Sequence, residues 1–198
     1  MRNYLLNDDI TIGFINNIEN ISVNDWQRLN NSTCPFLQHE FFSALEKSQS
    51  VSAKQGWQPH HLIATIENEL TAVMPMYLKS HSGGEYVFDW DWAEAFKRNG
   101  LDYYPKLVAT LPFTPVFSEK LLSTQVNMND IFEPLIEHCQ QEHINSWHVL
   151  YCPEIKTTLP EDVYQRNTVQ FHWFNRGYNS FDDFINTFTS RKRKNTRK

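Results

Sequence analysis

The feature that most constrains the fold is a pair of apolar runs, residues 61–66 and 70–78, joined by a three-residue polar link. Two runs of this length with so short a link predict an antiparallel β-hairpin. Pro75 lies inside the second run and lacks the N–H that a sheet ladder needs. The pattern therefore predicts an antiparallel sheet with an edge or a bulge at Pro75, and a fold made only of parallel βαβ units does not fit.

The remaining patterns predict further strands and helices around this hairpin. We expect strands at 11–15, 107–110, 147–151 and 169–174, and helices at 22–29, 39–47, 92–99, 130–143 and 180–189. Ser22 is the expected N-cap of the first helix. The apolar face of the second contains Phe41, Phe42 and Leu45, and the fourth directs Ile131, Leu135 and Ile136 inward. This order is typical of a mixed α/β (α+β) fold with one central, largely antiparallel sheet flanked by helices.

The composition is that of a folded globular protein. The chain has 198 residues, of which 40% are hydrophobic and 21% charged, and this suits one domain with a sizeable core. No apolar run approaches the ~20 residues of a membrane-spanning helix, and the N-terminus lacks the basic start and apolar stretch of a secretion signal. Three cysteines without CxxC spacing favour a reducing compartment, so we expect a cytoplasmic protein.

Charge is distributed unevenly along the chain. Residues 191–198 contain six bases and no acid, whereas residues 1–190 contain 12 bases and 23 acids. An acidic surface repels a phosphate backbone. The charge therefore disfavours nucleic-acid binding by the whole surface, and only the basic end suits it.

Several motif-based functions lose support. The six glycines fit neither GxGxxG nor GxxxxGK[ST], and the chain contains no HExxH, CxxC or GxSxG. Cys139 and His143 lie four residues apart on one predicted helix, but two ligands do not make a metal site. We expect no metal and no tightly bound cofactor.

The densest group of titratable and aromatic side chains lies in residues 81–92. Aromatic residues occupy every second position from Tyr86 to Trp92, so in an extended strand they would share one face and the acids the other. Asp91 and Glu94 also match a capping box, which favours a helix that begins at Trp92. We favour an extended piece followed by that helix.

Six stretches of uncommon residues keep a fixed order along the chain. They are Lys79–Ala93, Asp102–Lys106 (DYYPK), Pro112–Val116 (PFTPV), Gln170–Asn175 (QFHWFN), Phe181–Phe184 (FDDF) and Arg191–Lys194 (RKRK). Together they resemble the N-terminal half of the FemAB-like, GNAT-type N-acyltransferases, a bacterial family often labelled peptidoglycan biosynthesis proteins. The resemblance covers residues 38–198.

The resemblance implies an organisation for the chain. Family members are much longer and have a second acyltransferase-like half after the basic segment. We therefore expect a GNAT-like domain over residues 1–190, a basic linker or helix start over residues 191–198, and a chain that is a fragment or part of a split gene, whose missing half would be its partner. Pro75 would mark a splayed strand that receives an extended donor, as in a GNAT sheet.

One turn departs from the family pattern. After Thr114–Val116 the family usually has a glycine and an arginine, whereas this chain has Phe117–Lys120. If this turn cradles a donor phosphate, Ser118 and Lys120 are the candidates for it. Serine adopts strained backbone angles less easily than glycine, so the grip on the phosphate would be weaker.

The resemblance implies acyl transfer to an amine, which needs a base, donors for the oxyanion and an acid for the leaving group. We expect acyl-CoA or aminoacyl-tRNA as the donor and an amine on a small molecule or cell-wall precursor as the acceptor. The candidate catalytic residues are His81, Glu85, Asp89, Asp91 and Tyr104, with Asp89 or Asp91 as the base. The candidate substrate-binding residues are Trp90, Trp92, Tyr103 and Lys106, and the candidate donor-binding residues are Ser118, Lys120, Arg191 and Arg193.

Other interpretations of these residues stay open. The acids would suit a solvated strand face with Asp91 as a helix cap, and the aromatic set would suit core packing. The alternative function is a non-catalytic module that binds a sugar or peptide ligand, with the chemistry in an absent C-terminal half. The basic end suits a solvated helix end or linker, the phosphates of a donor, or nucleic acid.

Overall fold

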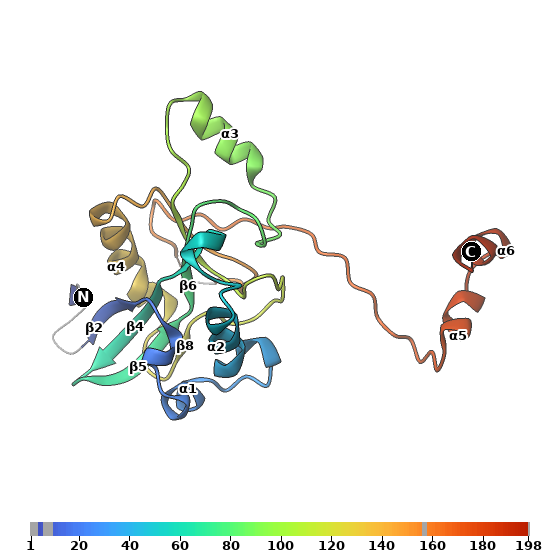
Figure 1. Ribbon diagram of the computed structural model, residues 1–198, viewed down its shortest axis with the longest axis horizontal. Coiled ribbons are helices and arrows are strands. Elements are labelled where there is room, and N and C mark those ends of the chain that lie inside the picture. The colour runs from blue at the N-terminus through green and yellow to red at the C-terminus, as the bar shows by residue number, and fades with distance from the viewer. Residues whose placement is uncertain (1–3, 6–9, 156–157, 198) are drawn as a thin grey trace. The chain divides into compact units, whose positions relative to one another are not determined.

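The structure is a computed structural model that describes residues 4–5, 10–155 and 158–197 (Figure 1). The chain groups into two compact units, residues 1–162 (unit 1) and residues 163–198 (unit 2). This grouping does not decide the domain boundary at residue 190, which stays a prediction. Lys198, the last residue of the predicted basic linker, lies outside the described residues.

Unit 1 contains nine strands and four α-helices within its described residues. The strands are β1 (Tyr4–Leu5), β2 (Ile10–Ile15), β3 (Trp57–Pro59), β4 (His61–Ile66), β5 (Glu69–Met74), β6 (Met76–Lys79), β7 (Lys106–Ala109), β8 (Leu122–Ser123) and β9 (Trp147–Val149). The helices are α1 (Val23–Leu29), α2 (His39–Lys47), α3 (Trp90–Arg98) and α4 (Met128–Gln141). No helix among the described residues of the chain has both the length and the apolar character to cross a bilayer.

The strands form two sheets. Sheet A has the order β1-β2-β4-β5-β8 and sheet B the order β3-β6-β7-β9. Every pairing is antiparallel except that between β7 and β9. The mixed, largely antiparallel α/β class is confirmed, with two sheets in place of the single central sheet that was predicted. The GNAT-like detail stays a prediction.

The predicted hairpin is formed by β4 and β5. Its register pairs Leu62 with Met74 and Ile66 with Glu69. Glu67 and Asn68 have φ angles of 50° and 67°, and positive φ at both central residues is the geometry that matches the twist of paired strands.

Pro75 separates β5 from β6 and thereby separates the two sheets. β5 pairs with β4 in sheet A, and β6 pairs with β7 in sheet B. Pro75 has no N–H to donate to a ladder. The next residue, Met76, forms a hydrogen bond through each of its backbone polar groups. Its carbonyl accepts from the His60 N–H at 2.9 Å, and its N–H donates to His61 Nδ1 at 3.1 Å. One segment thus passes from one sheet to the other at Pro75, where the sequence predicted an edge or a bulge within a single strand over residues 70–78.

Two cores cover the opposite faces of sheet A. Because successive side chains of a strand point to opposite faces, Leu62 joins a core with Ile131 of α4. Val73 instead joins a second core with Trp26 and Phe42, which come from α1 and α2. The faces of these helices are the ones that the sequence predicts to be apolar.

Most helices agree with the predictions. Ser22 caps α1, since its Oγ accepts from the Asp25 N–H at 3.0 Å. α2 spans the predicted residues 39–47. α4 buries Ile131 and Leu135 as expected and begins at Met128, two residues before the predicted start.

The start of α3 was predicted wrongly. The helix begins at Trp90, and Asp89 occupies the N-cap position without a capping hydrogen bond from its side chain. The predicted capping box with Asp91 as the N-cap is therefore wrong, and residues 85–89 form no strand. α3 has no buried residue and projects from the rest of unit 1 (Figure 1).

Unit 2 differs from the prediction in two respects. It contains two helices, α5 (Phe181–Asn186) and α6 (Ser190–Thr196), in place of one. The strand predicted at residues 169–174 is wrong, because residues 163–176 lie in neither strand nor helix. Alternation of side chains makes a strand only where a second strand pairs with it, and no strand occurs among the described residues of unit 2.

Gly84 lets the loop after β6 approach the body of unit 1. It has a φ of +83°, and a Cβ placed on it would lie 2.7 Å from Phe113 Cδ1 and 3.0 Å from Trp57 Cζ2. Gly100, which follows α3, has a similar φ of +70° but no heavy atom within 4 Å of its Cβ position. A side chain at either glycine would meet the cost of a positive φ, but only a side chain at Gly84 would also clash with neighbouring rings.

We expect Gly84→Ala to destabilise the protein more than Gly100→Ala. Both substitutions place a Cβ at positive φ, which costs about 1–2 kcal/mol, and only Gly84→Ala adds overpacking of about 1–3 kcal/mol. Urea unfolding followed by tryptophan fluorescence measures both losses. Equal losses would contradict the packing of Gly84 against Phe113.

Candidate functional site

Two buried lysines occupy paired positions in sheet B. Lys79 ends β6 and Lys106 begins β7, and the strand register places them opposite each other. Their side chains are 0% and 1% exposed. Burial penalises each charge and the two like charges repel, so this pair requires carboxylates nearby.

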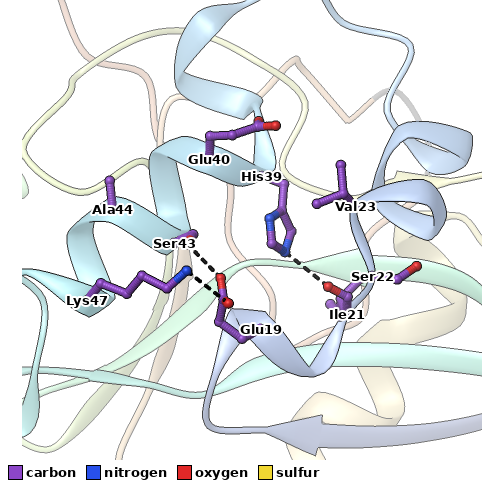
Figure 2. A pocket seen from close by; sticks show the side chains of 9 residues that line it. All are labelled: Glu19, Ile21, Ser22, Val23, His39, Glu40, Ser43, Ala44 and Lys47. Atoms are coloured by element: carbon purple, nitrogen blue, oxygen red, sulfur yellow. Dashed lines mark hydrogen bonds and ion pairs between the residues drawn. The ribbon is translucent and has the colours of Figure 1, made fainter.

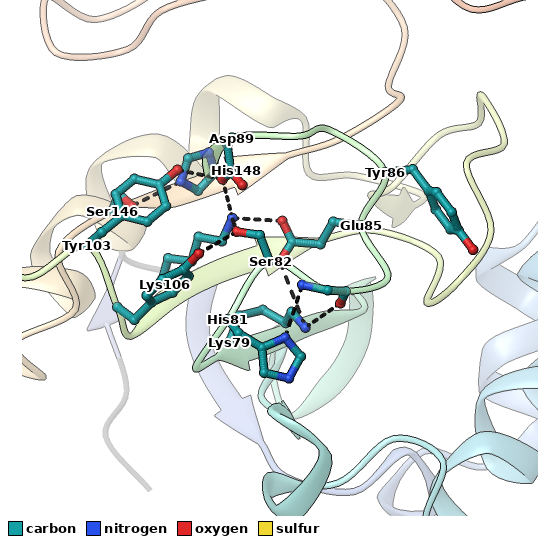
Figure 3. Close-up of polar contacts among 12 residues, drawn as sticks. Lys79, His81, Ser82, Glu85, Tyr86, Asp89, Tyr103, Lys106, Ser146 and His148 are labelled. Atoms are coloured by element: carbon teal, nitrogen blue, oxygen red, sulfur yellow. Dashed lines mark hydrogen bonds and ion pairs between the residues drawn. The ribbon is translucent and has the colours of Figure 1, made fainter. Parts of the chain in front are cut away.

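The loop after β6 supplies these carboxylates. Lys106 Nζ lies 2.7 Å from Glu85 Oε2 and 2.5 Å from Asp89 Oδ2, while Lys79 Nζ lies 3.9 Å from Glu85 Oε1. Figure 3 shows the Lys106 ammonium between the two acids. We call Lys79, Lys106, Glu85 and Asp89 the charge cluster.

Hydroxyl groups and rings complete the surroundings of the charge cluster. The Tyr103 hydroxyl donates to Asp89 Oδ2 at 2.6 Å. Ser82 Oγ accepts from Lys106 Nζ at 2.9 Å and lies 2.8 Å from the Tyr104 hydroxyl. Lys79 Nζ lies 3.4 Å from the centre of the Trp57 ring, a contact that stabilises a buried cation.

The environment shifts several pKa values. Burial lowers the pKa of Lys79 to about 7, although the Glu85 charge opposes this shift. Burial also raises the pKa of Glu85 against the effect of Lys106. For Asp89, burial favours the neutral form, but the hydrogen bonds from Lys106 and Tyr103 contribute to holding its pKa below the usual value. Groups with pKa values shifted in opposite directions are typical of sites that move protons.

Two carboxylate oxygens of the charge cluster have no hydrogen-bond partner among the described residues. They are Glu85 Oε1 and Asp89 Oδ1, and both atoms are buried. The Asp89 side chain is 12% exposed and the Glu85 side chain 0%. Asp89 is therefore the acid of the cluster whose side chain is partly exposed, although its Oδ1 atom is buried.

The structure brings together five of the candidate site residues from the sequence. Glu85, Asp89, Tyr103, Tyr104 and Lys106 share the contacts described above.

Other candidates lie outside the charge cluster. His81 is exposed, with Nε2 3.0 Å from the Gln55 carbonyl and Nδ1 accepting from the Gly83 N–H at 3.0 Å. Asp91 is exposed in the first turn of α3. Neither side chain therefore shares in the contacts of the charge cluster.

The exposed rings form a separate feature beside the cluster. Tyr86, Phe88, Trp90 and Trp92 are 48–67% exposed, and Figure 3 shows Tyr86 directed away from the cluster. The interpretation of these rings as core packing is therefore wrong, because they are exposed to solvent. Phe88 and Trp90 contact each other at 5.4 Å between ring centres.

Ser118 and Lys120 form a group of their own, outside the charge cluster but connected with it through Tyr151. Lys120 is buried, and its Nζ donates to the Ser118 carbonyl and Oγ, both at 2.8 Å, and to the Tyr151 carbonyl at 3.0 Å. The Tyr151 hydroxyl in turn donates to the Tyr86 carbonyl at 2.7 Å. Lys120 therefore holds this turn together, and Tyr151 connects the turn to the loop that carries Glu85.

Arg191 and Arg193 belong to unit 2. Arg191 is exposed. Arg193 is half-buried, and its guanidinium donates to the carbonyls of Asn186 and Phe188. Arg193 therefore joins α5 to α6 within unit 2.

Sequence reasoning missed four residues of this region: Lys79, Ser82, His148 and Tyr151. Burial and the Lys106 charge lower the pKa of His148 to about 4. One signal was present, since Lys79 and Lys106 each border an apolar strand and adjacent antiparallel strands place such ends together.

A surface hollow of about 560 Å³ lies elsewhere, between α1 and α2 (Figure 2). Its polar groups bind one another, because Glu19 accepts from Ser43 at 2.6 Å and pairs with Lys47 at 3.0 Å. His39 Nε2 lies 3.0 Å from the Ile21 carbonyl. These contacts join the first helices, so the charge cluster remains the stronger candidate for chemistry.

Comparison with known proteins supports the resemblance noted in the sequence. A family model described as peptidoglycan biosynthesis/recognition matches residues 17–198. The chain belongs to the FemAB-like family. No curated protein and no solved structure matches this FemAB-like chain. The family connects the protein with peptidoglycan but identifies neither donor nor acceptor.

We expect Lys106→Met to destabilise the FemAB-like chain by about 3–5 kcal/mol, because removal of one partner leaves buried charges uncompensated. Chemical unfolding measures this loss. Arg98→Met is the matched control, since Arg98 forms an exposed pair with Glu94 and should change stability by less than about 1 kcal/mol. A similar small loss for both variants would contradict the role of Lys106.

Lys79 should make stability depend on pH. The folded pKa is about 7 and the ordinary value is 10.5, so between these values the unfolded chain binds more protons and stability rises with pH. Relative to Lys79→Met, the wild type should gain about 2 kcal/mol between about pH 7 and about pH 9. Urea unfolding at both pH values tests this, with exposed Lys97→Met as the control. Parallel pH profiles for wild type and Lys79→Met would refute a buried lysine of low pKa.

Proposed function

We propose that this chain carries an acyltransferase site that moves an acyl or aminoacyl group from a thioester or tRNA ester to an amine on a cell-wall precursor. The family supports the connection with peptidoglycan. The charge cluster supports the chemistry, because it combines a lysine of low pKa with carboxylates held in fixed positions.

The observation that carries the proposal is the carboxylate of Asp89. Lys106 and Tyr103 hold its Oδ2, while its Oδ1 is buried without a hydrogen-bond partner among the described residues. An unpartnered buried acceptor is costly, and the ammonium group of an amine substrate is its chemical complement. We assign Asp89 to binding that ammonium.

The proton acceptor must have a pKa near the working pH. The lowered pKa of Asp89 makes it a weak base, whereas Lys79 has a pKa of about 7. Glu85, with a raised pKa, lies between the two lysines. We therefore assign acceptance of the amine proton to the Lys79–Glu85 pair, in place of the role that the sequence suggested for Asp89 or Asp91.

The reaction would then proceed in one balanced exchange. The amine nitrogen attacks the acyl carbon, a C–N bond forms, and the bond from that carbon to the donor sulfur or oxygen breaks. The bound ammonium first gives one proton to the Lys79–Glu85 pair and becomes a free amine, and the second proton leaves the nitrogen for solvent as the amide forms. The leaving thiolate or alkoxide takes a proton from Tyr104, whose half-buried hydroxyl lies beside Ser82, and solvent restores that proton.

A second candidate function is recognition without chemistry. The exposure of Tyr86, Phe88, Trp90 and Trp92 favours it, because exposed rings of this kind suit contact with sugar or peptide ligands. The charge cluster would then serve only to hold the loop that presents these rings. The family description includes recognition as well as biosynthesis.

Asp89→Asn should lower transfer by at least about 100-fold, because the ammonium loses its anionic partner. Exposed Asp91→Asn is the matched control and should stay within about twofold. The acceptor is a muramyl pentapeptide with a free lysine amine, and acyl-CoA and aminoacyl-tRNA are supplied in separate reactions. Thermal melting of both variants verifies that they are folded.

Two results would reject this proposal. One is transfer by wild type from neither donor, and the other is full transfer by Asp89→Asn. Stabilisation by the muramyl peptide that is lost in Trp90→Ala and Trp92→Ala, with no transfer, would support recognition instead.

A further inference from the structure

Unit 2 has a charge opposite to that of unit 1. Residues 163–198 contain eight Lys and Arg and only two acids, Asp182 and Asp183, a net charge of +6. Residues 1–162 contain ten Lys and Arg and 21 acids, a net charge of −11. A small cationic unit on an acidic protein is attracted to an anionic surface that repels the rest of the chain.

Unit 2 also exposes large apolar side chains. Phe171 is 97% exposed, and Val169 and Phe174 are 82% and 73% exposed. Tyr164, Trp173 and Phe181 are exposed as well. Soluble proteins seldom display so many large apolar groups in one short segment, and such displays mark surfaces that bind a partner or a membrane.

Four bases of unit 2, residues 191–194, lie on α6, which packs with α5. Phe184 and Phe188 contact each other at 4.9 Å between ring centres, and Ile185 is fully buried. Arg193 links α6 to the end of α5, and Arg197 pairs with Asp182 at 2.8 Å.

The same helix offers a site for anions. Ser190, Arg193, Lys194 and Arg197 line a surface hollow of about 360 Å³. Their spacing of three or four residues places them on one face of α6. Arg193 and Arg197 are engaged with α5, whereas Arg191, Lys192 and Lys194 are exposed. These three bases are therefore the ones presented to an anion from outside.

From these observations we infer that unit 2 is a peripheral membrane anchor that binds the surface of an anionic lipid bilayer. Clusters of Lys and Arg bind anionic headgroups, and exposed Phe and Trp side chains insert at the boundary between headgroups and acyl chains. The phosphate groups of the lipids match the hollow on α6. Phe171 and Phe174 supply the apolar contact.

The exposed residues favour a bilayer over nucleic acid. Proteins that stack bases present aromatic rings on a fixed surface, whereas residues 163–176 lie in no strand or helix. Val169, which is as exposed as its aromatic neighbours, has no ring to stack. A bilayer accepts aliphatic and aromatic groups without a fixed spacing, so it fits the whole segment.

The test is flotation of the full chain with lipid vesicles. We expect binding to vesicles that contain about one third phosphatidylglycerol in phosphatidylcholine, at least about tenfold weaker binding to phosphatidylcholine alone, and a marked loss at high salt. Combined Arg191→Gln, Lys192→Gln and Lys194→Gln should weaken binding at least about tenfold. Combined Phe171→Ser and Phe174→Ser should weaken it through lost insertion.

A matched control removes three exposed bases from unit 1. Lys54→Gln, Lys97→Gln and Arg98→Gln together should leave vesicle binding within about twofold. Absence of vesicle binding, equal binding to both kinds of vesicle, or equal loss in the control would overturn the inference. Tighter binding of a transfer RNA, lost in the same unit 2 variants, would replace the bilayer with nucleic acid. None of these readouts depends on acyl transfer, so the inference stands or fails separately from the proposed function.

Discussion

The site depends on one unfavourable arrangement: Lys79 and Lys106 face each other on neighbouring strands and both are removed from water. Two buried like charges are tolerated only when carboxylates compensate them. Glu85 and Asp89 provide this compensation, and both come from the loop that leaves β6. The loop therefore folds back over the strand ends instead of extending into solvent. Because Asp89 is the N-cap residue of α3, its pairing with Lys106 also fixes the place where the first turn of α3 begins.

Local patterns were sufficient for the elements whose stability is local. The apolar periods of α2 and α4, the Ser22 cap and the short polar link of the hairpin each predicted an element that the structure contains. The charge cluster required more, because the pairing of Lys79 with Lys106 spans two strands that are far apart in sequence. Periodicity within one strand carries no information about the register of its neighbour. The carboxylates were found as a dense group and Lys106 as a candidate substrate-binding residue, but Lys79 was missed.

Alternation of aromatic residues was misleading in both places where it occurred. Tyr86 and Phe88 have φ angles of 62° and 53°, so the backbone turns at each of them and cannot continue as a strand. These angles accompany the burial of Glu85 and Asp89, whose pairing with Lys106 outweighs the preference of aromatic residues for strands. Residues 169–174 alternate equally well, yet the described residues of unit 2 contain no strand. Alternation therefore describes a strand only when a partner strand is present.

The charge cluster and the exposed rings are parts of one arrangement rather than competing features. The cluster holds the loop at Glu85 and Asp89, Gly84 packs against Phe113, and the Tyr151 hydroxyl binds the carbonyl of Tyr86. Held at these points, the loop presents its aromatic side chains at fixed positions beside the only partly exposed acid of the cluster. Exposed rings stand on both sides of Asp89 in the sequence. The proposed recognition by the rings and the proposed chemistry at the acid would therefore both depend on the buried ionic network that holds this loop, and loss of that network would remove both.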